Sequence, residues 1–334
     1  MKRTYYLFNA GELTRTDNTL KFSAQDEEGN YQKPRYLPIE NVDQIYAFGS
    51  MTANSALFNF LGKAEVPVHF FDYYENYTGS FMPKDFLLSG KVLLAQARAY
   101  DNKKQRLDIA KRILTGAVYN IVKNLKYYDN RGKDLQPLVD IISGYSKNFD
   151  KVSTIQELMG LEGNIRKTYY EGFELIINDF SMSGRSMRPP QNEVNALISF
   201  GNMMCYAECL RSIYQTQLNP VISFLHEPGE RRYSLCLDIS EVFKPVIIDR
   251  VIFKVLNKRM INESDFERNM NRVILNEKGK KTFVQAIEEK MQETIVHRTL
   301  NKSVSYRHLI KLECYKLTKH ILGIEEYKPL KMWW

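Results

Sequence analysis

The first part of the chain carries short apolar segments separated by turn residues, which is the pattern of β-strands. Segments such as "RTYYLFN", "TLKFSA" and "VPVHFFDYY" are rich in Tyr, Phe and Val, and Gly, Pro, Asn or Asp lies between them. The stretch "SALFNFLGKAE" is compatible with one short helix among them. Short strands without alternating long helices favour antiparallel pairing. The pattern therefore predicts a small N-terminal antiparallel β-sandwich domain over residues 1–88.

After Gly90 the apolar residues recur every three or four positions, as on one face of a helix. The first such segment carries them at Leu107, Ile109, Ile113, Leu114, Val118, Ile121 and Leu125. Stretches containing Gly or Pro separate further helix-like segments at about 134–146, 153–180, 191–216, 246–260, 265–276, 280–296 and 303–321. We therefore predict an α+β protein in which residues 89–334 form a larger, all-α domain.

The composition indicates a soluble cytoplasmic protein. Of the residues, 44% are hydrophobic and 26% are charged, as in ordinary globular proteins. No uncharged apolar run approaches the roughly 18 residues that a membrane span needs, and the N-terminus lacks a signal-peptide pattern. Four cysteines are too few for a disulfide framework. No glycine-rich phosphate loop is present, so we expect neither ATP nor NAD.

The net charge of +8 is divided unevenly along the chain. Residues 1–90 hold 8 basic and 11 acidic side chains, a net −3, so the remaining 39 basic and 28 acidic side chains give +11. Such asymmetry suggests that the C-terminal part meets a polyanion such as nucleic acid. The alternative is a mildly basic protein without such a partner.

One histidine and two carboxylates stand close together in "FLHEPGERRYSLCLDISEVFKP". His226 precedes a turn, and Asp238 and Glu241 are three residues apart, so a helical turn would place both on one side. One imidazole with carboxylate oxygens suits Mn²⁺ or Mg²⁺ better than Zn²⁺, because no thiolate or second imidazole is evident. The alternative is structural: acidic residues at a helix N-terminus beside a buried histidine.

A third carboxylate, Glu162, lies in the apolar helical segment "LMGLEGNIRKTYYEGF". A buried charge without a partner is costly, so this side chain needs a cation. A metal ion would meet that need, which favours a metal site. Arg166, one helical turn later, is the alternative partner.

Arginines in two loops are candidates for contacts with DNA phosphates. Arg185 and Arg188 lie in "SMSGRSMRPP", and Arg231 and Arg232 follow His226. Contacts to phosphate would position DNA without reading its sequence. The alternative is that both are solvated surface loops.

Three stretches resemble a known family. "LEGNIRKTYY", "RPPQNEVNALISFGN" and "SFLHEPGERRYSLCLDISEVFKP" are similar to the CRISPR-associated endonuclease/integrase of spacer acquisition, the first-numbered CRISPR-associated protein, in a branch found with type I systems. The resemblance covers almost the whole chain, including the order of a β-rich and a helical domain. It implies a metal ion held by Glu162, His226 and Glu241, with Asp238 next to the site. Glu241 stands where many members have Asp, and Lys244 resembles a position that contacts DNA phosphate.

The resemblance also implies the partners. The family works as a homodimer, and two dimers flank a dimer of the small second CRISPR-associated protein, giving a heterohexamer. The assembly inserts a protospacer duplex into a CRISPR repeat. A divalent ion suits that chemistry, because it stabilises charge on a phosphodiester under attack and activates a 3′-hydroxyl or water.

We therefore predict a metal-dependent DNA integrase/endonuclease. One alternative is a structure-specific DNA repair nuclease that uses the same site for hydrolysis. The other is a non-catalytic DNA-binding subunit with a vestigial acidic cluster.

The end of the chain, "YKPLKMWW", carries both tryptophans. The sequence leaves open whether this tail is disordered, packs on a partner or packs on its own chain.

Overall fold

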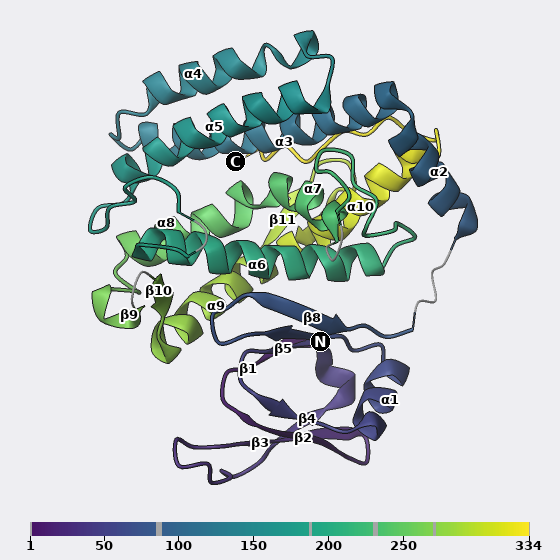
Figure 1. Ribbon diagram of the computed structural model, residues 1–334, viewed down its shortest axis with the longest axis vertical. Helices are drawn as coiled ribbons and strands as arrows, with labels where there is room; N and C mark the ends of the chain where they lie inside the picture. The colour runs from purple at the N-terminus through teal and green to yellow at the C-terminus, as the bar shows by residue number, and fades with distance from the viewer. Residues whose placement is uncertain (1, 85–88, 187–188, 230–232, 270–271, 334) are drawn as a thin grey trace. The chain divides into compact units, whose positions relative to one another are not determined.

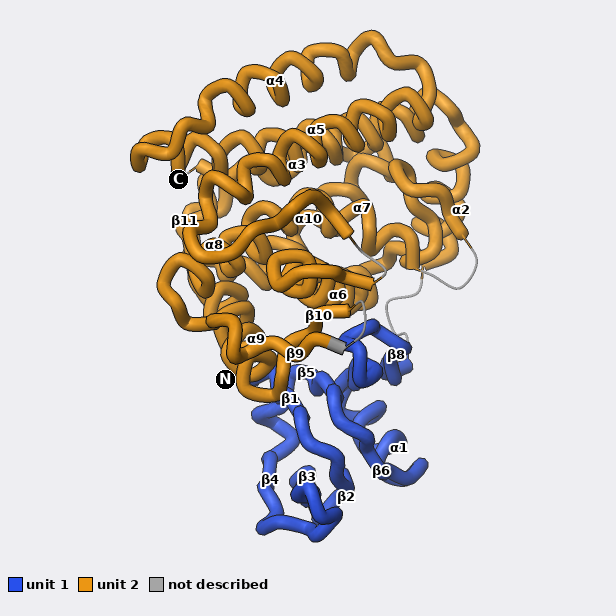
Figure 2. The backbone as a smooth tube through the Cα atoms, turned by 60° about the vertical axis from the view of Figure 1, so that its left-hand side comes forward, with its two compact units in different colours: residues 1–86 blue, residues 87–334 orange. Residues whose placement is uncertain are grey.

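The chain divides into two compact units, Met1–Phe86 and Leu87–Trp334 (Figure 2). In the computed structural model (Figure 1), the described residues are 2–84, 89–186, 189–229, 233–269 and 272–333. The predicted boundary after residue 88 adjoins residues 85–88, which lie outside the described part. The described residues contain no helix that is long and apolar enough to cross a membrane.

The described strands of the first unit form two four-stranded sheets around one apolar core. Leu13 and Leu20 of one sheet and Ile45 and Val68 of the other are fully buried in it. The first sheet has the order β1 (Arg3–Leu7), β5 (Val42–Ala47), β7 (Val68–Phe71), β8 (Tyr77–Phe81). The second sheet has the order β4 (Arg35–Pro38), β3 (Thr19–Ala24), β2 (Gly11–Thr16), β6 (Met51–Thr52).

Two sheets and a larger helical part confirm the predicted α+β class, but the predicted antiparallel pairing holds only for β2 with β3, β3 with β4 and β7 with β8. β5 pairs in parallel with both β1 and β7, and β2 pairs in parallel with β6. Parallel neighbours need a long crossover connection. Strands β2 to β4 of the other sheet supply it between β1 and β5, and helix α1 (Ser55–Lys63) supplies it between β5 and β7.

The second unit is mainly helical over its described residues. Its helices are α2 (Gly90–Asp101), α3 (Lys103–Asp129), α4 (Gln136–Ser146), α5 (Ile155–Ile176), α6 (Glu193–Tyr214), α7 (Ser234–Phe243), α8 (Arg250–Asn257), α9 (Glu277–Gln292) and α10 (Tyr306–Ile321). Helix α6 is buried on nearly all sides and packs against α7 and α10. It is therefore the central helix of this unit.

This unit also contains strands, so the prediction that it is all-α was wrong. Its described residues include two antiparallel strand pairs: β9 (Phe266–Asn269) with β10 (Arg272–Leu275), and β11 (Thr294–His297) with β12 (Lys302–Ser305). The first replaces the helix predicted over 265–276. Its run Val273, Ile274 and Leu275 is buried throughout, which suits a strand covered on both faces better than an amphipathic helix.

A π-helical turn, Pro245–Asp249, joins α7 to α8. Pro245 has no N–H group and cannot continue the hydrogen-bond ladder of α7. The amide of Asp249 donates instead to the carbonyl of Lys244, five residues back, at 3.0 Å. The proline thereby ends the short helix that carries Glu241, and the helix resumes in a wider register.

Two buried asparagines of α3 hold one carbonyl group near the end of α7 and one in this turn. Asn120 Nδ2 donates to the carbonyl of Val242 at 3.0 Å, and Asn124 Nδ2 donates to that of Pro245 at 2.6 Å. Both asparagines are completely buried. The backbone next to Glu241 is therefore fixed by side chains more than a hundred positions earlier in the sequence.

The C-terminal tail packs on its own unit, which answers the question that the sequence left open. Tyr327 and Met332 are completely buried. Glu313 Oε1 accepts hydrogen bonds from the Tyr327 hydroxyl at 2.7 Å and from the Leu330 amide at 3.0 Å. Asn120 extends the network, since it donates to the Leu330 carbonyl and accepts from the Met332 amide.

Replacing Asn120 by alanine is expected to destabilise the second unit by about 3 kcal/mol, because it leaves three buried backbone groups without their partner. Urea unfolding of the full chain measures this. Trp333 lies in the tail and contacts the His297 ring, so its fluorescence reports release of the tail directly. Asn164→Ala, at an exposed position of α5, serves as the control and should change stability by less than about 0.5 kcal/mol. Equal stability of the two variants would contradict the anchoring role of Asn120.

Candidate active site

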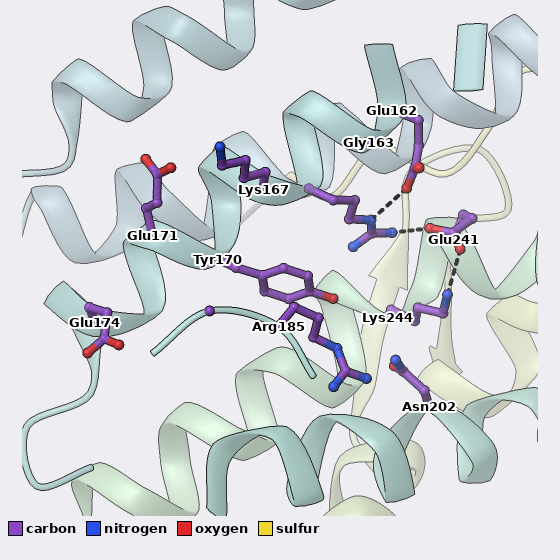
Figure 3. A pocket seen from close by; sticks show the side chains of 12 residues that line it. Glu162, Gly163, Lys167, Tyr170, Glu171, Glu174, Arg185, Asn202, Glu241 and Lys244 are labelled. Atoms are coloured by element: carbon purple, nitrogen blue, oxygen red, sulfur yellow. Dashed lines mark hydrogen bonds and ion pairs between the residues drawn. The ribbon is translucent and has the colours of Figure 1, made fainter. Parts of the chain in front are cut away.

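A pocket of about 690 Å³ in the helical unit contains most of the candidate residues that the structure describes (Figure 3). Helix α5 supplies one wall with Glu162, Arg166, Tyr170 and Glu174, which lie four residues apart and hence on one helix face. The other walls are formed by the loop before α6, by α6 and by the end of α7. The start of α5 is fixed by a capping box between Thr154 and Glu157.

Two carboxylates from different helices meet at one guanidinium. Arg166 Nε donates to Glu162 Oε1 at 3.1 Å, and its Nη2 donates to Glu241 Oε2. Lys244 Nζ donates to the other Glu241 oxygen at 2.5 Å. Arg166 is thus a partner of Glu162, as the spacing allows. It also binds a carboxylate that is 75 positions away in the sequence.

These contacts decide the charge of Glu241, whose side chain is only 6% exposed. Burial alone would raise its pKa, but the nearby charges of Arg166 and Lys244 outweigh burial and hold the pKa well below its ordinary value. Burial would lower the pKa of Lys244, and Glu241 raises it instead. The carboxylate is therefore ionised, and the ammonium group is charged, at neutral pH.

Asp238 holds His226 in a defined orientation. Its carboxylate is completely buried and accepts three backbone N–H bonds, from Phe224, Leu225 and His226, at 2.6 to 3.0 Å. It also pairs with His226 Nδ1 at 2.9 Å. With Asp238 as acceptor, Nδ1 carries the proton and Nε2 keeps its lone pair. Burial lowers the pKa of His226, but the hydrogen bond and charge of Asp238 raise it overall.

The structure brings the predicted metal ligands together only in part. Glu162 and Glu241 share Arg166, and the charges of Glu241 and His226 influence each other's pKa. Among the described residues, however, no three His, Cys, Asp or Glu side chains are grouped so that they could hold a metal ion. In the conformation seen, Arg166 is the cation that the two carboxylates share.

The donor types nevertheless fit a divalent cation. Glu162 and Glu241 already converge on a positive group, which stands in for such an ion. His226 is held through Nδ1 by a carboxylate, as metal-bound histidines commonly are, so Nε2 is the atom available to a metal. Carboxylate oxygens with one imidazole suit Mg²⁺ or Mn²⁺.

Of the arginines predicted to contact phosphate, only Arg185 lies in the described part of the chain. It lines the pocket together with Tyr170 and Asn202, whose side chains are drawn near it in Figure 3. Arg188, Arg231 and Arg232 lie outside the described residues. Lys244 lines the same pocket, where its charge faces Glu241.

Sequence reasoning missed Tyr170, Glu174 and Asn202 as pocket residues. For the first two, the signal was present in their spacing from Glu162 along one face of α5. For Asn202, the signal was the polar spacing within α6, where Asn195 lies seven positions earlier on the same face.

Comparison with known proteins identifies the family. A family model described as CRISPR associated protein Cas1 matches residues 5–289. The CRISPR-associated endonuclease Cas1 of Fusobacterium nucleatum is 45% identical, over 100% of this chain and 98% of its own. The CRISPR-associated protein Cas1 1 of Methanobrevibacter ruminantium is 46% identical, over 100% and 99%.

Solved structures agree. A Cas1 protein from Thermotoga maritima superposes with a TM-score of 0.87 at 38% identity, covering 99% of this chain and 100% of that chain. A casposase bound to an integration product has a TM-score of 0.87 at 20% identity, covering 100% and 95%, and shares the fold. The chain belongs to the CRISPR-associated protein Cas1 family.

Proposed function

We propose that this chain is a metal-dependent DNA integrase and endonuclease of CRISPR adaptation. It joins the 3′-hydroxyl ends of a protospacer duplex to a CRISPR repeat by transesterification. The observation that carries the proposal is the convergence of Glu162 and Glu241 at one cationic position, on a chain that also orients His226 through Asp238. Its membership in a family of named endonucleases supports the same class of reaction.

Each residue of the site has its own role in this proposal. Glu162, His226 and Glu241 would hold Mg²⁺ or Mn²⁺, which stabilises charge on the phosphate under attack. Asp238 keeps the imidazole in the tautomer that leaves Nε2 available. Lys244 holds a positive charge at the edge of the pocket, where a DNA phosphate would enter.

We also propose that the chain acts as a homodimer and that two dimers bind a dimer of a small second CRISPR-associated protein, giving a heterohexamer. A fold relative at 17% identity is itself a component of a Cas6-RT-Cas1–Cas2 complex, and another at 15% belongs to a Cas1–DNA complex. The excess positive charge after residue 90 supports DNA as the ligand of the helical unit.

The decisive experiment incubates the protein and its small partner with a labelled duplex and a plasmid that carries a repeat. Label should become joined to the plasmid with Mg²⁺ or Mn²⁺ present, and a duplex with 3′-dideoxy ends should give no joined product. Plasmid cleavage without joining, insensitive to the 3′-hydroxyl, would instead support a structure-specific repair nuclease. Binding without either reaction would support a non-catalytic subunit.

Lys244→Ala is expected to weaken DNA binding and to reduce its salt dependence by about one phosphate contact. Metal binding should persist, because Glu241 keeps its carboxylate. Affinity for a labelled duplex, measured over a range of salt concentrations, tests this. Lys63→Ala, at an exposed lysine of the first unit, is the control and should leave the salt dependence unchanged. Loss of the metal, or an unaltered salt dependence, in Lys244→Ala would contradict the assignment.

A further inference from the structure

Arg185 places a positive charge in the pocket, and no carboxylate among the described residues is bound to it. Its Nη1 donates to Asn195 Oδ1 at 2.8 Å and to the Ser186 carbonyl, and its Nη2 donates to Ser199 Oγ at 3.1 Å. All three acceptors are neutral. The neighbouring Tyr170 hydroxyl and the charge of Asp249 raise the pKa of the guanidinium less than burial lowers it.

Arg166 and Arg185 line the same pocket but differ in their electrostatic surroundings. Burial would lower the pKa of both. At Arg166, the charge of Glu241 reverses the effect and raises the pKa. At Arg185, burial prevails and the pKa is lowered. Arg166 is therefore already neutralised by protein, whereas Arg185 keeps a charge that an anionic ligand would compensate.

The loop that carries Arg185 is held in an unusual conformation. Ser183 and Gly184 both have positive φ angles, 47° and 83°, and the first is uncommon for a residue with a side chain. Glu174 Oε1 accepts the amides of Met182 and Ser183, each at 2.6 Å, and the Ser181 hydroxyl at 3.1 Å. The Glu174 carboxylate therefore fixes the backbone of this loop.

Asn195 holds the other end of the loop. It is completely buried, accepts from the Ser186 amide at 3.1 Å and donates to the Gly184 carbonyl at 2.8 Å. The same Oδ1 atom accepts from Arg185. The guanidinium therefore stands in place before any ligand arrives, which lowers the cost of ordering it on binding.

We propose that Arg185 forms a preorganised subsite for a DNA phosphate adjacent to the reacting one, and that Glu174 is the positioning residue that builds it. The subsite shares its pocket with Glu241 and Lys244, and about 690 Å³ accommodates a nucleotide-sized ligand. The assignment of the ligand as DNA rests on the proposed function.

Glu174 provides a test, because its charge and its position in the loop predict opposite changes in DNA affinity when the carboxylate is removed. Removing a carboxylate from a pocket that binds a polyanion should by itself strengthen binding. If Glu174 instead builds the subsite, its loss should weaken binding. Glu171 lines the same pocket, is exposed, and carries the same charge on the same helix. It serves as the matched control for the charge effect.

The experiment measures the affinity of the full chain for a labelled DNA duplex at several salt concentrations, with thermal unfolding recorded for each variant. Arg185→Gln should weaken binding about tenfold and reduce the salt dependence by about one contact. Glu174→Ala should weaken binding severalfold, whereas Glu171→Ala should bind as tightly as the wild type or more tightly. Glu174→Gln keeps an acceptor oxygen without the charge and should restore wild-type affinity.

Each other outcome has a defined meaning. Tighter binding by Glu174→Ala, or unchanged binding by Arg185→Gln, in a wild type that joins DNA overturns the subsite and leaves the proposed function intact. Weakened binding by Arg185→Gln in a wild type that binds but does not join DNA supports the subsite and overturns integration. A wild type that does not bind DNA overturns both.

Discussion

Replacing His226 by alanine is expected to lower strand transfer and cleavage by at least about a hundredfold, while DNA binding and thermal unfolding stay close to wild type. The imidazole is the proposed nitrogen ligand, and loss of a metal ligand removes the ion that stabilises the transition state. Folding should survive because Asp238 retains three backbone N–H donors after the imidazole is gone. Joining of labelled duplex to a repeat-bearing plasmid measures the activity.

The matched control for this variant is His308→Ala. His308 is an exposed histidine of α10, and its replacement should leave activity unchanged. Mn²⁺ binding, followed by electron paramagnetic resonance, separates loss of the ion from loss of turnover. Full activity in His226→Ala would show that the imidazole is not part of the reacting site. If His226→Ala lost activity but kept wild-type Mn²⁺ affinity, the imidazole would contribute to the reaction without binding the metal.

The parts of this site that depend on local spacing could be predicted from the sequence. Glu162 and Arg166 are one helical turn apart, and the pair forms in the structure. Asp238 and Glu241 are three residues apart and lie on one helix, α7, as expected. Pro245 follows the end of that helix in the structure, and its missing N–H group has the same consequence in any fold.

Contacts between distant segments could not be predicted in the same way. Nothing in the periodicity around Arg166 shows that it also reaches Glu241, or that Asn120 joins α7 to the tail. An apolar pattern shows that a segment is buried, but it does not show which other segment it packs against. The same limit explains the parallel pairing of β5, since direction is set by crossovers rather than by the strand itself.

Replacing Arg166 by methionine is expected to destabilise the metal-free protein by about 3 kcal/mol, since breaking a buried ion pair leaves an uncompensated charge. Met keeps most of the apolar volume and removes only the cation. Among the ion pairs that the described residues form, Glu241, almost completely buried, would keep the one with Lys244, and Glu162 would lose the cation it pairs with in the structure. The depressed pKa of Glu241 means that its ion pairs contribute fully above the ordinary pKa of glutamate and are lost only as the pH falls through its folded value. Measurements at pH 7 therefore capture the whole effect.

The same variant is expected to bind Mn²⁺ or Mg²⁺ more tightly than the wild type, because a metal ion no longer competes with the guanidinium for Glu162 and Glu241. Added metal should therefore raise the melting temperature of Arg166→Met more than that of the wild type. Arg259→Met is the control: Arg259 forms an ion pair with Asp179 on the surface, where its side chain is 79% exposed, so neither stability nor metal response should change appreciably. If Arg166→Met proved as stable as the wild type without metal, Arg166 would not be the cation that balances the two carboxylates. If Arg166→Met bound the metal more weakly than the wild type, Arg166 would help to bind the ion instead of competing with it.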